Sequence, residues 1–163
     1  MCGIAGFVGK GTEEDLHKMV YSIRHRGPDS QDIYKQDELG FVHARLSVID
    51  LSTGANQPFF NDDKSLVMVF NGEIYNYLEL KEEIYKLRKH TFRTTSDTEV
   101  LLYLFQEYGV EMLQKINGMF AFAIYDFQKK ELFVAKDRLG KKPLYYGIFN
   151  GTFIFASEPK AIL

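Results

Sequence analysis

Apolar residues in the first half of the chain follow two different spacings. Residues 3–9 form a short apolar run bounded by glycines, which predicts a buried strand. Helical spacing follows, with apolar residues at i, i+3, i+4 and i+7, and it predicts an amphipathic helix over 13–24. Residues 39–50 alternate enough to predict a long strand. A second buried strand is predicted at 66–70, where the Asn71-Gly72 pair stops it.

The second half of the chain changes from helical to strand periodicity. Residues 76–89 mix apolar positions with many Lys and Glu, which is typical of a surface helix. Ser96 with Glu99 three residues later predicts a capping box for a helix over 97–108. Four short strands are predicted from residue 118 onward, with the sequences GMFAFAIYD, ELFVAKD, PLYYGIF and TFIFAS.

The order of these elements predicts the fold class. Strands come first, two helices follow, and a run of antiparallel strands completes the chain. This order favours an α+β domain in which two sheets pack face to face with helices outside. At 163 residues the chain is long enough for one domain with a substantial core. It ends at SEPKAIL, which resembles the start of a helix, so we expect a domain cut from a longer protein.

Charge and cysteine content exclude several classes of function. The net charge is −2 with acids and bases interspersed, which argues against a nucleic-acid partner. No apolar run approaches 18 residues and no signal peptide begins the chain, so we expect no membrane contact and a cytoplasmic location. A single cysteine excludes an intrachain disulfide and a cysteine-built zinc site, and we expect no metal.

The single cysteine, Cys2, lies directly behind the initiator methionine. That methionine is normally removed when the second residue is small, which would leave Cys2 with a free α-amine beside its thiol. An α-amine has a pKa of about 8, so a neutral fraction exists at pH 7 and can act as a general base toward the thiol. The alternative is that Cys2 is simply a small buried apolar residue.

Three further stretches carry what a cysteine nucleophile needs to act on a carbonyl group. Arg45, within an apolar strand, requires an anion, either a ligand carboxylate or one of the domain's own acids. Asn71 and Gly72 offer a side-chain amide beside a backbone N–H, as in an oxyanion hole, or form only a turn. Asp97, in the first turn of a helix, accepts a ligand ammonium group or only complements the helix dipole.

Two loops have less specific sequences. RHRGPDS (24–30) contains His25 and either covers a site as a mobile lid or simply connects a helix to a strand. AKDRLGKKPLYYG (135–147), with Asp137 and Gly140, is predicted to be a structural turn.

Together these stretches resemble the glutaminase domain of class II glutamine amidotransferases, which are N-terminal-nucleophile hydrolases. Among them the chain is most similar to the glutamine-hydrolysing asparagine synthetase group. The resemblance implies a four-layer αββα sandwich of two mainly antiparallel sheets, as a single domain over 1–163. It rests on the motifs MCGIAGFVG, RHRGPDS, HARLSVIDLSTGANQPF, NGEIYNY, SDTEVLLYLFQEYG, NGMFAFAIYD and KDRLGKKPLYY.

The resemblance also implies roles for single residues. Cys2 is similar to the family's nucleophile, with its own α-amine as the base, and Asn71 and Gly72 are similar to the oxyanion hole. Arg45 resembles the residue that holds the α-carboxylate of glutamine, and Asp97 the one that receives the α-ammonium group. Further glutamine contacts are implied for Glu73, for the backbone of Val48 and Ile49, and for the loop around Arg26.

The implied reaction is hydrolysis of the side-chain amide of L-glutamine through a γ-glutamyl thioester on Cys2. It gives glutamate and ammonia, and the ammonia passes to a C-terminal synthetase domain that activates aspartate with ATP. No cofactor is implied for the glutaminase domain, since ATP and Mg²⁺ belong to the synthetase domain. A homodimer is also allowed. No SGGxDS-type pyrophosphate loop occurs in this chain, so it is not expected to make asparagine alone.

One further departure from the family and three alternative functions remain. The family's usual Arg-Asp pair before the Gly-x-x-Pro-Leu-Tyr turn is Lys136-Asp137 here, which affects local packing only. The ammonia acceptor can instead be a sugar phosphate or a cell-wall intermediate. A non-catalytic glutamine-binding module that keeps Met1 is the alternative from another class. A hydrolase of other amides fits less well, because Arg45 and Asp97 match the two charges of a free amino acid.

Overall fold

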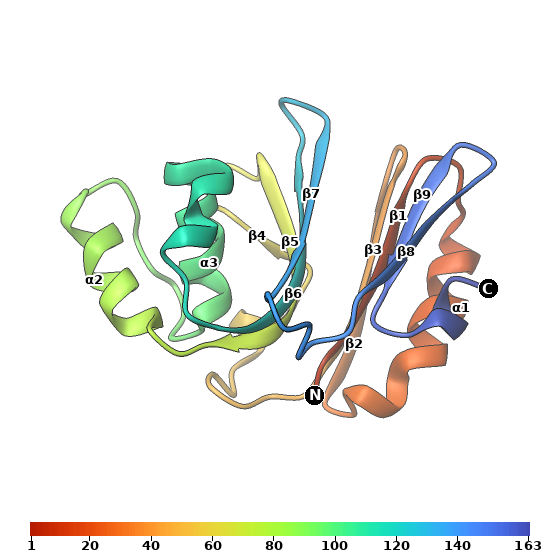
Figure 1. Ribbon diagram of the computed structural model, residues 1–163, viewed down its shortest axis with the longest axis horizontal. Coiled ribbons are helices and arrows are strands. Elements are labelled where there is room, and N and C mark those ends of the chain that lie inside the picture. The colour runs from red at the N-terminus through yellow and green to blue at the C-terminus, as the bar shows by residue number, and fades with distance from the viewer.

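The computed structural model describes residues 1–163, and its strands form two antiparallel sheets (Figure 1). Sheet A has the strand order β2-β3-β1-β9-β8. Its central strand β1 pairs with β3 on one side and with β9 on the other, so the two ends of the chain lie together. The strands of sheet A are β1 (Gly3–Val8), β2 (Ser30–Gln36), β3 (Leu39–Arg45), β8 (Tyr145–Phe149) and β9 (Thr152–Ala156).

Sheet B has the strand order β4-β5-β6-β7. Its long strands β5 and β6 pair over their full length, from Leu66 opposite Asp126 to Ile74 opposite Gly118. The short strand β4 pairs only with residues 67 and 68, so the rest of that edge of β5 has no neighbouring strand. The strands of sheet B are β4 (Phe59–Phe60), β5 (Leu66–Ile74), β6 (Gly118–Asp126) and β7 (Glu131–Lys136).

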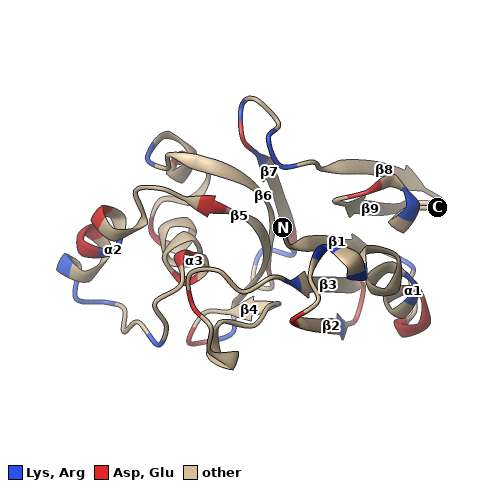
Figure 2. Ribbon diagram, turned by 90° about the horizontal axis from the view of Figure 1, so that it is seen from below, with Lys and Arg blue, Asp and Glu red and all other residues tan.

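Helices cover the outer faces of the two sheets (Figures 1 and 2). Helix α1 (Glu13–Ile23) packs its apolar stripe on sheet A, and α3 (Asp97–Tyr108) packs on sheet B with α2 (Tyr77–Lys86) against it. The layers therefore run α–β–β–α, which confirms the expected fold class. The longest helix has 12 residues, and no helix is long and apolar enough to cross a membrane.

The alternation of side chains along each strand builds the layers of the core. Odd-numbered positions of β1 pack against α1, and even-numbered positions of β5 pack against α3. The opposite faces of the strands meet between the sheets and form a third apolar cluster. That cluster contains Ile4, Leu39, Phe41, Val67, Val69, Ala121, Ala123 and Phe155.

The rows of inward-facing residues change from apolar to polar at one end of this inter-sheet layer. In β3 the row continues to His43 and Arg45, and in β5 it continues to Asn71. In β1 the same row continues backward to Cys2, just before the strand begins. Because side chains on one face of a strand are two residues apart, these four residues all reach the same end of the layer.

Two predicted strands have different ends in the structure. The strand predicted over 39–50 ends at Arg45, because the following loop leaves the sheet and exposes its apolar residues; the side chain of Leu51 is 78% exposed. The strand predicted over 66–70 instead continues through Asn71-Gly72 to Ile74. The Asn-Gly pair is not a turn here, because β6 holds it in the ladder opposite Ala121 and Phe120.

The helix ends show a second group of differences. Ser96 does cap α3, but it accepts from the Thr98 amide, and the Glu99 carboxylate turns instead to the amides of Arg93 and Thr94. The predicted capping box is therefore wrong. A capping box forms at α1, between Thr12 and Asp15.

Four more elements also differ from the prediction. Strands β2 and β4 were not predicted. The helix predicted over 76–89 spans only 77–86, and the end of the chain forms a single 3₁₀ turn over 159–161.

Candidate active site

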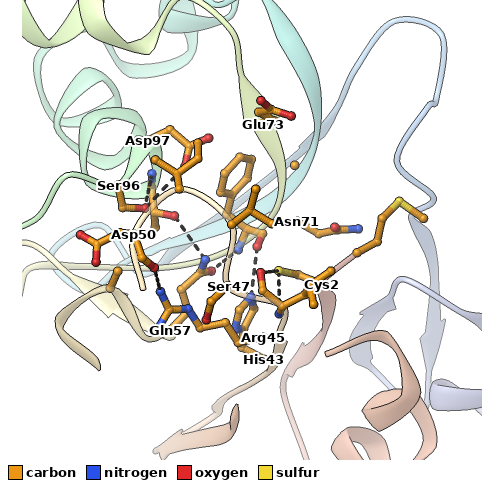
Figure 3. Close-up of a pocket in the computed structure, with 18 of the residues that line it drawn as sticks. Cys2, His43, Arg45, Ser47, Asp50, Gln57, Asn71, Glu73, Ser96 and Asp97 are labelled. Carbon is orange, nitrogen blue, oxygen red and sulfur yellow. Dashed lines mark hydrogen bonds between the residues drawn. The ribbon is translucent and has the colours of Figure 1, made fainter. Parts of the chain in front are cut away.

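A cavity of about 200 Å³ opens where the inter-sheet layer becomes polar (Figure 3). This volume is below the roughly 300–1,000 Å³ of pockets for drug-sized ligands, so the cavity fits a small molecule. Of the nine predicted site residues, eight line it. They are Cys2, Arg45, Val48, Ile49, Asn71, Gly72, Glu73 and Asp97.

Cys2 is held at the wall of the cavity by its neighbours on both sides. Its Sγ lies 3.4 Å from the amide nitrogen of Leu46 and 3.5 Å from the carbonyl oxygen of the same residue. Its own carbonyl accepts a hydrogen bond of 3.0 Å from Arg26 Nε. Burial raises the pKa of the thiol, while the Leu46 hydrogen bond and nearby positive charges, including Arg45 and Lys142, act in the opposite direction.

Asn71 presents a buried hydrogen-bond donor without a partner. Its side chain is 1% exposed, and its Nδ2 donates to no protein atom. Leaving such a donor unpaired costs about 1–3 kcal/mol. A buried donor at a cavity wall is suited to an acceptor that the cavity receives from outside.

The free edge of β5 supplies a second donor beside Asn71. Alternate residues of an antiparallel strand turn their amides to the same edge. The Phe70 amide donates to Gln57 Oε1 at 2.6 Å, and the Ile74 amide donates to Asp97 Oδ2 at 3.0 Å. Gly72 lies between these two, so its N–H points to the same edge, where no strand covers it.

Close packing between β5 and β6 also explains why residue 72 is a glycine. A Cβ atom on residue 72 would lie 2.3 Å from the carbonyl oxygen of Met119, a backbone atom of β6 that cannot move aside. Only glycine keeps the two strands in register here. The Asn71 side chain and the Gly72 amide thus offer two hydrogen-bond donors at the cavity, the kind of groups that an oxyanion hole uses.

Arg45 is a buried cation without an acidic partner. Its side chain is 7% exposed and forms no ion pair, so the alternative of a structural ion pair is excluded. Three of its N–H groups donate to the loop that follows β3, at the carbonyls of Asp50 and Ser52 and at Asn56 Oδ1. Since a guanidinium has five N–H donors, two are left for a carboxylate in the cavity.

Asp97 contributes a negative charge to the cavity wall, in contrast to the positive charge of Arg45. It lies in the first turn of α3, with Oδ2 fixed by the Ile74 amide. Burial raises its pKa to about 6, and the negative charge of Glu73 acts in the same direction. A bound ammonium group would relieve both effects, because it restores a counter-charge that the protein does not supply.

Arg26 does not line the cavity, and the structure places it behind Cys2. Its Nε bonds the Cys2 carbonyl, and its Nη1 pairs with Glu158 at 2.9 Å. The same loop contacts the cavity wall indirectly, since Asp29 accepts a hydrogen bond from the Ser47 amide at 2.7 Å. His25 also contacts Glu158 and is far from a catalytic geometry.

Three cavity residues were missed by the sequence analysis. His43 is fully buried, with Nε2 3.2 Å from the Phe70 carbonyl, and burial lowers its pKa to about 3. Gln57 bonds both Phe70 and Thr98. Lys142 comes from the loop expected to be only structural. The sequence signal for His43 is its spacing: it lies two residues before Arg45, so both side chains lie on the same face of β3.

The loop that carries Lys142 also has the structural role expected of it. The Asp137 carboxylate accepts hydrogen bonds from the amides of Phe120, Leu139, Lys141 and Lys142, which fixes the turn.

Comparisons with known proteins agree with this geometry. The family model described as "Glutamine amidotransferase domain" matches residues 1–163. The chain is 42% identical to asparagine synthetase [glutamine-hydrolyzing] 2 of Bacillus subtilis, over 99% of this chain and 22% of the relative. It is also 42% identical to a putative asparagine synthetase [glutamine-hydrolyzing] 2 of Methanocaldococcus jannaschii, over 100% of this chain and 35% of the relative. The chain thus spans about a fifth to a third of these relatives.

Solved structures agree on the fold. Glutamine phosphoribosylpyrophosphate amidotransferase of B. subtilis superposes with a TM-score of 0.78 at 23% identity, over 99% of this chain and 43% of that one. An allosteric regulatory enzyme of purine biosynthesis gives a TM-score of 0.80 at 23% identity. Because the family model spans the whole chain and the relatives exceed 40% identity, this chain belongs to the glutamine amidotransferase domain family, in its class II, N-terminal-nucleophile form.

Proposed function

We propose that this domain hydrolyses the side-chain amide of L-glutamine through a γ-glutamyl thioester on Cys2. The observation that carries the proposal is the unpartnered Nδ2 of Asn71 at the wall of the cavity that also holds Cys2. A nucleophilic thiol and a preorganised pair of donors, Asn71 Nδ2 and the Gly72 amide, are what acyl transfer requires.

The reaction proceeds in two balanced steps. After Met1 is removed, the α-amine of Cys2 takes the thiol proton, and the sulfur attacks the amide carbon of glutamine. The negative charge on the amide oxygen is stabilised by Asn71 and Gly72, and collapse of the intermediate transfers the proton to the leaving nitrogen, which departs as ammonia. A water molecule then attacks the thioester, releases glutamate and returns the proton to the sulfur.

The two charged ends of the cavity wall support glutamine as the substrate. Arg45 has two donors left for the α-carboxylate, and Asp97 with Glu73 offers negative charge to the α-ammonium group. An amide within a peptide chain has neither charge beside it. The cavity therefore favours a free amino acid over a peptide.

The use made of the ammonia is the second part of the proposal. The names of the curated relatives support delivery to a synthetase domain that makes asparagine. An acceptor of another kind remains the alternative, because the acceptor is chosen outside residues 1–163. The expected cytoplasmic location and homodimer remain predictions, and no cofactor or metal enters the proposed steps.

Intact-mass measurement with 6-diazo-5-oxo-L-norleucine, an electrophilic glutamine mimic, tests the proposal. We expect a protein without Met1 that gains one equivalent of label, and no label on Cys2→Ala. Asn71→Ala should lose kcat for glutamate release by roughly 10²–10³-fold with little change in KM. Retained Met1 without labelling or glutamate release would instead identify a glutamine-binding module.

A further inference from the structure

Lys142 is a buried charge that the steps above do not use. Its side chain is 5% exposed and lines the same cavity as Cys2. The ammonium group has no carboxylate within ion-pair distance, and its side-chain contact is the thioether sulfur of Met1, at 3.0 Å. Its backbone is fixed, because the Lys142 amide donates to Asp137 Oδ2 at 3.1 Å.

An ammonium group in this position needs a negative partner. Burial lowers the pKa of Lys142, whereas Cys2 and the carboxylate of Glu73 favour its charged form. A thioether is a weak acceptor and supplies no charge. The sulfur of Cys2 is the protein group in this cavity that becomes negative during the proposed reaction, whereas Asn71 and Gly72 serve the substrate oxygen.

The other charges around Cys2 have different partners. Arg26 is neutralised by Glu158, His43 is buried in its neutral form, and Arg45 is neutralised once a substrate carboxylate binds. The charged and titratable groups that surround Cys2 or line its cavity are the chain's α-amine, Arg26, His43, Arg45, Asp50, Glu73, Asp97 and Lys142. Lys142 is therefore the side-chain cation near Cys2 that keeps no paired carboxylate when glutamine occupies the site.

We propose that Lys142 is a positioning residue for the nucleophile, with its ammonium group stabilising the Cys2 sulfur as a thiolate. Removal of Met1 frees the ammonium from the thioether and leaves it in the cavity that Cys2 also lines. The thiol proton leaves to the α-amine, and no other reactant is needed. The inference rests on the proposed function only in taking Cys2 as the nucleophile.

The test is the pH dependence of Cys2 alkylation by iodoacetamide, a neutral reagent, in protein shown by mass to lack Met1. Cys2 is the single cysteine, so every alkylation reports on it. Lys142→Met should slow alkylation at pH 7 about tenfold, which corresponds to a rise of about one unit in the thiol pKa. Lys142→Arg should restore the wild-type profile. Lys141→Met is the matched control, because it removes the same charge from an exposed neighbour.

Equal profiles for Lys142→Met and Lys141→Met would overturn the inference, as would failure of Lys142→Arg to restore the profile. If Lys142→Met does not fold, Lys142→Gln removes the charge and takes its place under the same criteria. Alkylation needs no glutamine, so this outcome is independent of the test of the proposed function. If Lys142→Met lost labelling by the glutamine mimic but kept the wild-type alkylation profile, Lys142 would act in substrate binding, and the inference about the thiol would be overturned.

Discussion

Asp97 Oδ2 accepts a hydrogen bond of 3.0 Å from the backbone amide of Ile74, which ties the first turn of α3 to the strand that carries Asn71. Gln57 makes a parallel connection, since it bonds Phe70 on β5 and Thr98 on α3. The carboxylate proposed for the substrate ammonium and the donors proposed for the oxyanion therefore belong to one rigid frame. Asp97 and Asn71 are therefore held at a fixed position relative to each other.

Asp97→Asn removes the negative charge of this residue but keeps an oxygen that can accept the hydrogen bond from the Ile74 amide. The asparagine oxygen still accepts from Ile74, whereas the ion pair with the α-ammonium group is lost. We expect KM for glutamine to rise about 10–100-fold, since hydrogen bonds to charged groups are worth about 1.5–3 kcal/mol. Hydrolysis of glutaramate, which lacks the α-amine, should differ little between wild type and variant. An equal loss with both substrates would contradict the assignment.

The pH dependence of catalysis should follow the same carboxylate. Because burial raises the pKa of Asp97 to about 6, kcat/KM should fall as the pH is lowered through 6, and Asp97→Asn should lack this step. The stability effect has the opposite sign, since ionising the buried group costs free energy as the pH rises from about 4 to 6. Asp97→Asn should therefore match or exceed wild-type thermal stability at pH 7, and lose that advantage at pH 4.

Arg45→Met tests recognition of the α-carboxylate. The guanidinium has no acidic partner in the protein, so its remaining donors are available to the ligand. Wild type should strongly prefer glutamine to 4-aminobutanamide, which lacks the carboxylate. We expect Arg45→Met to lose most of this preference, mainly through KM for glutamine. Unchanged selectivity would show that Arg45 serves only the loop after β3.

Gly72→Ala tests the close contact between β5 and β6. The new Cβ would lie 2.3 Å from the Met119 carbonyl, so we expect a loss of about 1–3 kcal/mol in unfolding free energy and a loss of activity. Gly54→Ala is the matched control near the site, because its nearest neighbours lie at 3.5 and 3.9 Å. Chemical denaturation of both variants measures the difference, and equal stabilities would refute the expected clash.

His43→Gln tests the cost of keeping an uncharged histidine inside the protein. Its pKa is lowered to about 3 when folded, so the unfolded chain binds the extra proton and stability is lost as the pH falls below about 6.5. The loss should reach about 3 kcal/mol by pH 4.5, at about 1.4 kcal/mol per pH unit. Denaturation at several pH values should show a shallower acid loss in His43→Gln, and no such change in exposed His17→Gln.

Elements with a single strong signal were predicted well from the sequence. Helix 97–108 has the expected bounds, because a serine cap and an apolar run agree on where it begins. Strand β2 was missed because its polar sequence SQDIYKQ forms a partly exposed edge of sheet A. Its partner β3 specifies the pairing, and no local pattern within 30–36 records that contact.

The sequence motifs predicted which residues belong to the candidate site better than they predicted how the fold places them. Asn71-Gly72 was assigned to the end of a strand, whereas β6 keeps both residues in the ladder and turns the Gly72 amide to the free edge. Lys142 and Gln57 carry no local signal of chemistry. They reach the cavity because Asp137 fixes one loop and Phe70 meets the other.

The strand that begins behind Cys2 has neighbours made at opposite times during synthesis. Strand β3 leaves the ribosome soon after β1, whereas β9 follows only after all of sheet B has been made. The Ser157 hydroxyl then accepts a hydrogen bond of 3.0 Å from the Ile4 amide of β1. Glu158 pairs with Arg26 behind Cys2.

A nascent chain therefore carries Cys2 long before β9 is available to pair with β1. Until residue 158 has been added, Arg26, which bonds the Cys2 carbonyl, lacks the carboxylate that pairs with it behind Cys2. The interval leaves the N-terminus open to the enzyme that removes methionine.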